Sequence, residues 1–430
     1  MQYSPSRRTA VVLCGTGAHG AYHAGVLRAL QEAGVKIDVV AGQGVGAAAA
    51  VLAAIDGASR LWDADGIWRS ERASRFYQRA PAVRIVRWCL QAIVIILTVS
   101  LVAFAGVAAP PAVLEIIAAL VAVPLLTIAV TLARARWRPG ARRVFGSAWW
   151  SVAGAPFDPN PAIDAFSDAV WQLIRGAARD VRPPREAGRR YAEALAENIG
   201  QPGFRELMMV ATDLDARGDV VAAMLREPYR RDFIAPRPGR ERRAEALDLA
   251  GLGRDHALDV MSAALTPPVA CEPRNVTFAP DGYWRGESHR LCERPGSISR
   301  LFEELAGAGV SQLIVVTAVP MSSTPHQLRV PRLDARSRLG EFIAAAEAAA
   351  LRDAMDHALL RFDSCYVIAP SHNPVGPFDF GGAYDEASDR RHTMLELMER
   401  AYEDAYRQFI EPVVGASGEQ IAGVGSARPR

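Results

Sequence analysis

Residues 11–30 are VVLCGTGAHGAYHAGVLRAL, an apolar run that enters a glycine-rich loop and then a stretch with helical spacing. The apolar run predicts a buried strand, and the residues from Gly20 onward predict a helix. Backbone N–H groups at such a helix start are unpaired and lie at the positive end of the helix dipole, so they attract anions. The loop around Gly15, Gly17 and Gly20 is therefore predicted to bind a dinucleotide pyrophosphate or the oxyanion of an ester under attack.

The dinucleotide interpretation has some support in the spacing. The three glycines match G-x-G-x-x-G, and Asp38 follows about 20 residues later. The ribose-binding acid of such sites lies at the end of the second strand, whereas Asp38 precedes the apolar run of residues 39–41. We therefore expect Asp38 at the opposite edge of the sheet, which disfavours a dinucleotide.

Residues 39–54, VVAGQGVGAAAAVLAA, predict a second strand, a tight turn and an alanine-rich helix. A Gly-x-X-x-Gly turn between a strand and a helix is typical of a nucleophile elbow, in which a serine occupies the central position. Here the central position of Gly42–Gly46 is Gly44. The sequence thus predicts an elbow without its nucleophile.

The rest of the chain limits its class. Apolar strands alternate with helical patterns, which predicts an α/β fold with a mostly parallel sheet. The net charge of +2 gives no reason to expect nucleic acid as a partner. Five scattered cysteines without CxxC spacing predict neither a disulfide framework nor a zinc site. His19 and His23 are one helical turn apart without a third ligand in the pattern, so we expect no metal and no cofactor.

Two long apolar runs interrupt the α/β pattern. Residues 90–109 contain no charge, residues 113–132 contain only Glu115, and Pro110-Pro111 separates the runs. A 20-residue helix is about 30 Å long, which matches the hydrocarbon thickness of a bilayer. Arginines flank the pair on both sides, and positive residues stay in the cytoplasm. The pattern predicts a two-helix membrane hairpin with the main domain cytoplasmic; the flanking arginines are Arg75, Arg79, Arg84, Arg87, Arg134, Arg136, Arg138, Arg142 and Arg143.

Several motifs together resemble the patatin-like phospholipase family. Residues 15–27 resemble its glycine loop and following helix, with His19 in a basic position, and residues 42–46 resemble its G-x-S-x-G elbow. Four later segments resemble family motifs in the same order: PFDPNPAIDAF (156–166), MMVATDLDARGDVV (208–221), VMSAALTPPV (260–269) and APDGYWRGES (279–288). The resemblance implies a patatin-like three-layer fold, here interrupted by the hairpin.

The resemblance also implies a serine–aspartate dyad, with Gly15, Gly17, His19 and Gly20 around the oxyanion. The serine position holds Gly44, and alignment on Tyr-Trp-Asp-Gly places Arg285 in the aspartate position. A shifted alignment would keep Asp281, four residues away, about 13 Å along an extended chain. We expect no intact catalytic residue.

These observations predict a membrane-anchored patatin-like protein, catalytically impaired, that binds acyl lipid or anionic headgroups. The alternatives are an active lipid acyl hydrolase with a displaced nucleophile, although Ser262, Ser288 and Ser371 lack an elbow pattern, and a scaffold for other membrane proteins. We expect the first part of the patatin-like domain over residues 1–87, the hairpin over 88–133 and a linker over 134–160. The second part of the domain is expected over 161–320 and a C-terminal helical extension over 321–430.

Overall fold

The computed structural model describes residues 3–106, 109–136, 154–176, 184–235, 244–281, 284–321, 334–386 and 388–415. The chain divides into two compact units. The first, which we call the α/β domain, consists of Met1–Phe76, Pro159–Pro268 and Pro273–Arg430. The second, which we call the hairpin unit, consists of Tyr77–Asp158 and Val269–Glu272. Each is described by itself.

A nine-stranded sheet forms the centre of the α/β domain, with the strand order β11-β10-β1-β2-β5-β6-β7 and with β8 and β9 attached beside β5. The five strands from β11 to β5 are all parallel, whereas β6 and β9 run antiparallel to β5. The predicted mostly parallel sheet is therefore confirmed. The strand bounds are β1 Thr9–Gly15, β2 Val39–Gly44, β5 Glu206–Asp213, β6 Gly218–Met224, β7 Ala244–Asp248, β8 Arg274–Thr277, β9 Ser288–Cys292, β10 Gln312–Thr317 and β11 Ser364–Ile368.

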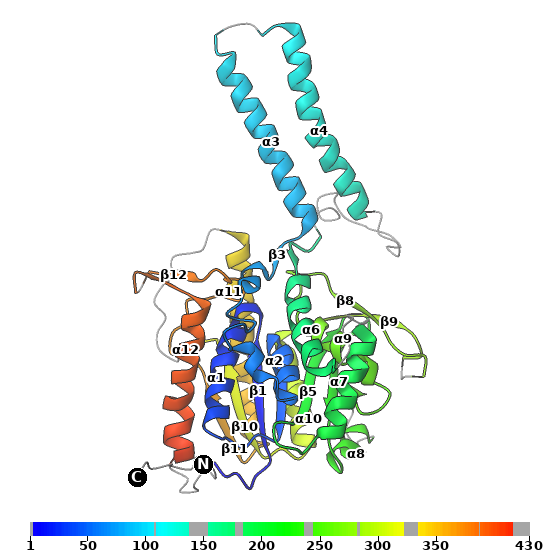
Figure 1. Cartoon of the computed structure of the whole chain (residues 1–430), viewed down its shortest axis with the longest axis vertical. Coiled ribbons are helices and arrows are strands. Elements are labelled where there is room, and N and C mark those ends of the chain that lie inside the picture. The colour runs from blue at the N-terminus through cyan, green and yellow to red at the C-terminus, as the bar shows by residue number, and fades with distance from the viewer. Residues whose placement is uncertain are drawn as a thin grey trace. The chain divides into compact units, whose positions relative to one another are not determined.

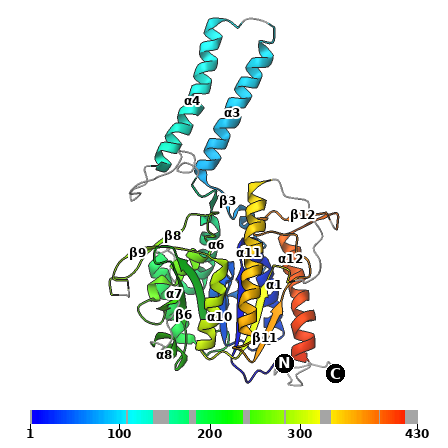
Figure 2. The same ribbon diagram turned by 180° about the vertical axis from the view of Figure 1, so that it is seen from behind.

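Helices cover both faces of this sheet, which gives three layers. Helices α1, α2 and α12 lie on the face toward the viewer in Figure 1, and α10 and α11 lie on the opposite face, seen in Figure 2. The helix bounds in the α/β domain are α1 Gly20–Glu32, α2 Val45–Ala54, α6 Asn160–Ile174, α7 Pro184–Asn198, α8 Tyr229–Ile234, α9 Ala257–Ala264, α10 Ile298–Gly307, α11 Ala335–Ala358 and α12 Met394–Ala405, which continues as a π-helical segment over Tyr406–Val414.

Shorter elements complete the α/β domain. A two-stranded ribbon joins β12 (Ala383–Asp385) to β13 (Arg390–His392) in antiparallel pairing. Single 3-10 turns are η1 Gly17–His19, η2 Ala58–Leu61, η3 Glu71–Arg75, η4 Arg254–His256 and η5 Pro295–Ser297.

The core explains why these strands and helices form where they do. Strands β1 and β10 are buried along their whole length, as expected for parallel strands covered on both faces. All ten residues of α2 are buried, and most of them are alanine. Small side chains let this helix approach the sheet closely: a Cβ at Gly46 would lie 2.0 Å from the carbonyl oxygen of Leu13. The glycines of the elbow are therefore part of the packing between α2 and the sheet.

The secondary structure departs from the sequence patterns in places. Composition rich in arginine and proline favours loops over residues 179–190 and 226–243, yet α7 begins at Pro184 and α8 spans Tyr229–Ile234. Arginine is a good helix former, and proline is well placed at a helix start. The pattern over 391–410 predicts a helix, and the structure has one there; it begins at Met394, after β13, because Thr393 caps it in a capping box with Glu396. Residues 321–430, expected to be helical, also supply β11, which pairs with β10.

The hairpin unit consists of two antiparallel helices with a short strand pair at their base. Helix α3 spans Pro81–Ala103 and α4 spans Pro111–Arg136, and β3 (Gln78–Arg79) pairs with β4 (Phe157–Asp158). Both helices are long and apolar enough to cross a membrane, and no residue in their apolar windows is buried. Their large exposed side chains are Ile85, Trp88, Leu90, Val94, Ile95, Leu97, Val99, Leu101, Val102, Leu114, Ile116, Leu120, Val123, Leu125, Leu126 and Val130. Most of the predicted linker, 137–153, lies outside the described residues.

Candidate functional site

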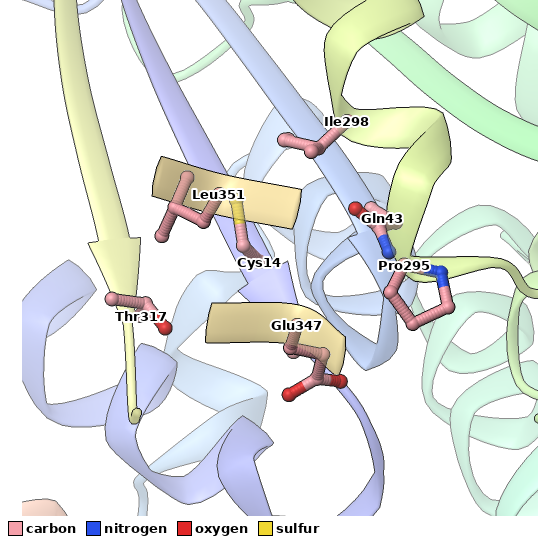
Figure 3. A pocket seen from close by; sticks show the side chains of 8 residues that line it. Cys14, Gln43, Pro295, Ile298, Thr317, Glu347 and Leu351 are labelled. Carbon is pink, nitrogen blue, oxygen red and sulfur yellow. The ribbon is translucent and has the colours of Figure 1, made fainter. Parts of the chain in front are cut away.

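A small cavity lies at the carboxyl ends of β1, β2 and β10, where ligands bind in open parallel sheets (Figure 3). Its lining comes from β1, β2, β10, η5, α10 and α11, and consists of Cys14, Gly15, Gln43, Pro295, Ile298, Thr317, Glu347 and Leu351. Its volume is about 10 Å³, which is close to the minimum of about 10–15 Å³ that admits one water molecule. The cavity is far too small for an acyl chain.

Gly44 holds the backbone conformation of a nucleophile elbow. It connects β2 to α2 with φ 61° and ψ −136°, a combination that L-residues rarely adopt. A serine at an elbow tolerates this strain because the turn pushes its hydroxyl out of the sheet. Glycine adopts the same conformation without a Cβ penalty. The turn therefore retains the elbow geometry although it presents no side chain.

The space in front of Gly44 is occupied by Glu293, which follows β9. A Cβ built on Gly44 would lie 2.3 Å from Glu293 Oε1 and 2.4 Å from the carbonyl oxygen of Gly15. Both separations are far below van der Waals contact. A serine side chain therefore does not fit at Gly44 unless Glu293 and the backbone at Gly15 move.

Glu293 belongs to a buried polar cluster with Thr16, Glu347 and His19. The Thr16 hydroxyl lies 2.5 Å from Glu293 Oε1 and is also hydrogen-bonded to Glu347 Oε1. His19 Nδ1 lies 3.3 Å from Glu347 Oε2, within ion-pair distance but without hydrogen-bond geometry. Burial, and then the charge of Glu347, raise the pKa of Glu293 well above its usual range. The cluster thus places the Glu293 carboxyl group directly against Gly44, and Thr16 connects it to Glu347.

The glycine loop is closed by a distant part of the chain. The Ala18 N–H donates a hydrogen bond of 2.8 Å to the carbonyl oxygen of Pro377. A Cβ at Gly17, whose φ is +57°, would lie 2.1 Å from that same oxygen and 3.4 Å from the ring of Phe380. A backbone carbonyl thus occupies the N–H group between Gly17 and His19, two of the residues predicted to surround an oxyanion.

The segment around Pro377 is fixed on both sides of this contact. Asn373 Nδ2 donates to the carbonyl oxygen of Ala318, immediately after β10, at 2.9 Å. Arg336, in the first turn of α11, donates to the carbonyl oxygen of Phe378 at 2.5 Å. Phe378 and Phe380 are both buried. The segment packs as part of the core of the α/β domain.

The two candidates for the aspartate position lie elsewhere. Asp281 and Arg285 are both exposed in the connection between β8 and β9, and Arg285 has a positive φ of 44°. Gly282 and Tyr283, on which the choice of alignment depends, lie outside the described residues. Neither Asp281 nor Arg285 lines the cavity. Among the predicted site residues, the structure brings together Gly15, Gly17, His19, Gly20 and Gly44.

Asp38 lies where the sequence placed it, immediately before β2. Its Oδ2 accepts a hydrogen bond of 2.9 Å from the Thr9 N–H at the amino end of β1. This is the edge of the sheet opposite the glycine loop. The expected position of Asp38, at the edge of the sheet opposite the glycine loop, is therefore confirmed.

A histidine–aspartate pair was missed by the sequence analysis. His289 Nδ1 is hydrogen-bonded to Oδ2 of Asp213, at the carboxyl end of β5, and His289 Nε2 lies 3.3 Å from Glu287 Oε2. Burial lowers the pKa of His289, but the hydrogen bonds and charges of Asp213 and Glu287 outweigh it and leave that pKa raised. The two residues are 76 positions apart, so no local sequence pattern predicts the pair.

Glu293 and Glu347 were missed for a similar reason. Glu347 lies in an alanine-rich helix, where a glutamate ordinarily indicates a solvent-facing position, and Glu293 follows a short strand. Their proximity depends on α11 folding across the carboxyl end of β1, a tertiary contact. Sequence spacing alone gives no signal for it.

A mostly parallel sheet, a glycine loop before α1 and a glycine turn before α2 form the arrangement that the sequence motifs predicted. The family model described as Patatin-like phospholipase matches residues 11–173, which confirms the predicted resemblance to this family over that part of the chain. A search of the curated proteins finds no match. Among solved structures, the crystal structure of VipD from Legionella pneumophila aligns over 95% of this chain and 67% of that one, with 13% identity and a TM-score of 0.32, too low to carry an argument.

Proposed function

We propose that this chain is a membrane-anchored patatin-like protein that contacts lipid and lacks the serine-hydrolase chemistry of its fold. The observation that carries the proposal is the carboxyl group of Glu293, 2.3 Å from where a Cβ on Gly44 would lie. The absence of a hydroxyl at Gly44 removes the nucleophile, and loss of such a group typically reduces the rate by about 10⁴–10⁶. The Pro377 carbonyl oxygen accepts a hydrogen bond from the Ala18 N–H of the glycine loop. This N–H is then not available to an oxyanion, which supports the same proposal.

Two of the serines considered for a displaced nucleophile, Ser262 and Ser288, are hydrogen-bonded to groups that cannot act as a base. Ser262 Oγ donates to the carbonyl oxygen of Leu258 in its own helix at 2.7 Å. Ser288 Oγ lies 2.7 Å from the hydroxyl of Thr277. Neither hydroxyl is hydrogen-bonded to a histidine or carboxylate that could act as its base, as nucleophilic catalysis requires.

Lipid contact is proposed at two places. The exposed apolar side chains of α3 and α4 would lie in the hydrocarbon, with both ends of the hairpin on the cytoplasmic side because arginines flank it. The exposed guanidinium of Arg285 is proposed to bind a phosphate or carboxylate headgroup, for which its planar donor geometry is suited. Arg285→Ala should then weaken binding to vesicles of anionic phospholipid, and unchanged binding would refute this part.

Fluorophosphonate labelling and ester hydrolysis of the detergent-purified protein test the loss of chemistry. We expect the natural protein to be silent in both assays. The sharper comparison is Gly44→Ser/Glu293→Ala, which restores a hydroxyl and removes the side chain that blocks it, beside Glu293→Ala alone as the matched control. Labelling of the natural protein at any serine would overturn the proposal, and the labelled peptide would identify the nucleophile.

A further inference from the structure

The contacts of the Thr16 hydroxyl with Glu293 and Glu347 determine how many protons these three side chains must hold together. A threonine hydroxyl has one proton, so it can donate to only one of the two carboxyl oxygens that it contacts. The second contact joins two oxygen acceptors unless a carboxyl group carries a proton and donates it to Thr16. The geometry therefore requires a proton on one of the two glutamates.

The surroundings supply little positive charge to replace that proton. Both carboxyl groups are buried, and Glu347 Oε2 has no hydrogen-bond partner although it borders the cavity. Within the part of the chain that the structure describes, no group of three or more His, Cys, Asp or Glu side chains is arranged to hold a metal ion. Two adjacent buried carboxylates repel each other, and one of them is normally protonated.

The other titratable and charged groups facing the pair come from three elements. From β1 and α1 these are Cys14, His19 and His23; burial lowers the pKa of His23 to about 4, so its ring is neutral. Burial, and secondarily Glu347, raise the pKa of Cys14, so its thiol is neutral as well. On the β9 side, Cys292 is a neutral thiol, and the Arg294 guanidinium is held by Asp219 at 2.5 Å. His19 Nδ1 lies 3.3 Å from Glu347 Oε2.

We propose that Glu293 and Glu347 share one proton through the Thr16 hydroxyl, and that this proton-binding site holds the pocket at Gly44 closed. The proton lets Glu293 remain against Gly44 and Glu347 remain over the cavity, where two carboxylates would repel each other. Loss of the proton is expected to separate the carboxyl groups and open the space at the elbow. The site is thus a proton site built where the fold's nucleophile would be.

The sign of the pH dependence follows from linkage. A carboxyl group with a folded-state pKa above its unfolded value of about 4.3 contributes stability below that value and loses it as pH rises toward the folded-state pKa. Glu293→Gln removes this dependence because the amide carries its donor at every pH. The stability of the variant relative to the natural protein should therefore increase as pH rises above about 5.

The experiment measures the melting temperature of the full-length protein in detergent from pH 4.5 to pH 9, beside Glu293→Gln and the exposed control Glu197→Gln. We expect the difference between Glu293→Gln and the natural protein to grow by a few degrees in favour of the variant over this range. The control should keep a constant difference. A Glu293→Gln difference that is constant with pH would overturn the proposal.

A second measurement applies even where Glu293→Gln does not fold. The natural protein at pH 7.5 should show an infrared carbonyl band of a protonated carboxyl group, and Thr16→Val, nearly isosteric, should shift that band by removing the bridging hydroxyl. Thiol labelling of Cys14, which lines the cavity, should rise at pH 9 relative to Glu293→Gln at the same pH. A band that Thr16→Val leaves in place would refute the shared proton.

Discussion

The hairpin unit and the α/β domain depart from the usual distribution of side chains in opposite ways. Helices α3 and α4 expose leucine, valine and isoleucine along their length, whereas the α/β domain buries glutamate, aspartate, arginine and histidine around its sheet. Isolated exposed apolar residues are ordinary, but a continuous exposed apolar surface indicates an interface. A buried charge, in contrast, indicates a specific partner, because its desolvation must be offset by that partner.

The difference teaches what each kind of region needs in order to be recognised. The hairpin is defined by composition over some 20 consecutive residues, and its helices satisfy their backbone hydrogen bonds internally. The buried polar groups of the domain are defined by partners far away in sequence. The ion pair of Arg8 with Glu206, for example, joins residues 198 positions apart at 2.7 and 2.8 Å.

The largest expected effect is the loss of membrane association when the hairpin is removed. Ala80 N–H donates to the carbonyl oxygen of Pro156 at 2.8 Å, so the two ends of the hairpin are adjacent and can be joined after residues 81–155 are deleted. A two-glycine link suffices, since β3 and β4 then form an ordinary two-residue hairpin. We expect the shortened protein in the soluble fraction after carbonate extraction, with retained circular dichroism of the α/β domain.

Leu97→Ala serves as the control for the deletion, because it changes one exposed apolar residue in the hairpin and should leave the protein in the membrane. A shortened protein that stays in the membrane fraction would contradict the assignment of membrane contact to the hairpin. Membrane contact would then belong to the α/β domain, and the exposed apolar helices would require another partner.

A smaller effect is expected from the buried ion pair of the domain. Glu206 accepts two hydrogen bonds from Arg8 and lies 3.2 Å from Arg226, with a side chain only 4% exposed. Glu206→Gln leaves the Arg8 charge buried, which costs about 3–5 kcal/mol of unfolding free energy. Denaturant unfolding would measure this loss as a lower midpoint.

Asp168→Asn is the matched control for Glu206→Gln. Asp168 pairs with Arg72 at 3.4 Å, but both side chains are about half exposed or more, at 49% and 72%. Surface pairs of this kind contribute about 0–1 kcal/mol. Equal losses in the two variants would show that burial does not set the strength of charge pairing in this domain.

The third effect concerns the glycine loop. Gly17→Ala places a methyl group 2.1 Å from the Pro377 carbonyl oxygen at a backbone φ of +57°. We expect a loss of about 1–3 kcal/mol, because the loop must leave its conformation or the Pro377 segment must move. Gly218→Ala, where an added Cβ meets nothing within 4 Å, is the control and should lose much less. Limited proteolysis within the segment 373–382 would distinguish the two causes of a loss at Gly17.

Much of the fold is accessible from sequence because it rests on local patterns. The strands at Thr9–Gly15 and Gln312–Thr317 are continuous apolar runs, and the elbow at Gly42–Gly46 is marked by glycines that close packing requires. Strand β11 was missed because it follows a long helix and joins the sheet only through its pairing with β10. Helices α7 and α8 lie in stretches rich in arginine and proline, where composition favours a loop although arginine is a good helix former.

The residues of the candidate site also differ in whether a local sequence pattern reveals them. Gly15, Gly17, Gly20 and Gly44 are visible in sequence because a backbone conformation or a close approach demands glycine. Glu293, Glu347 and Pro377 are not visible, since each reaches the loop from a segment more than 250 residues away. The sequence therefore indicates the position of the candidate site but not the residues that occupy it.

The contact of Gly17 with Pro377 has a consequence for how such a motif persists through evolution. A glycine that faces a carbonyl of its own chain is under selection for folding, whether or not any substrate is ever bound. Relatives that share the Pro377 segment would keep the glycine pattern long after catalysis had been lost. In such a lineage the pattern would record common descent and packing, and the residue facing Gly44 would be the better indicator of activity.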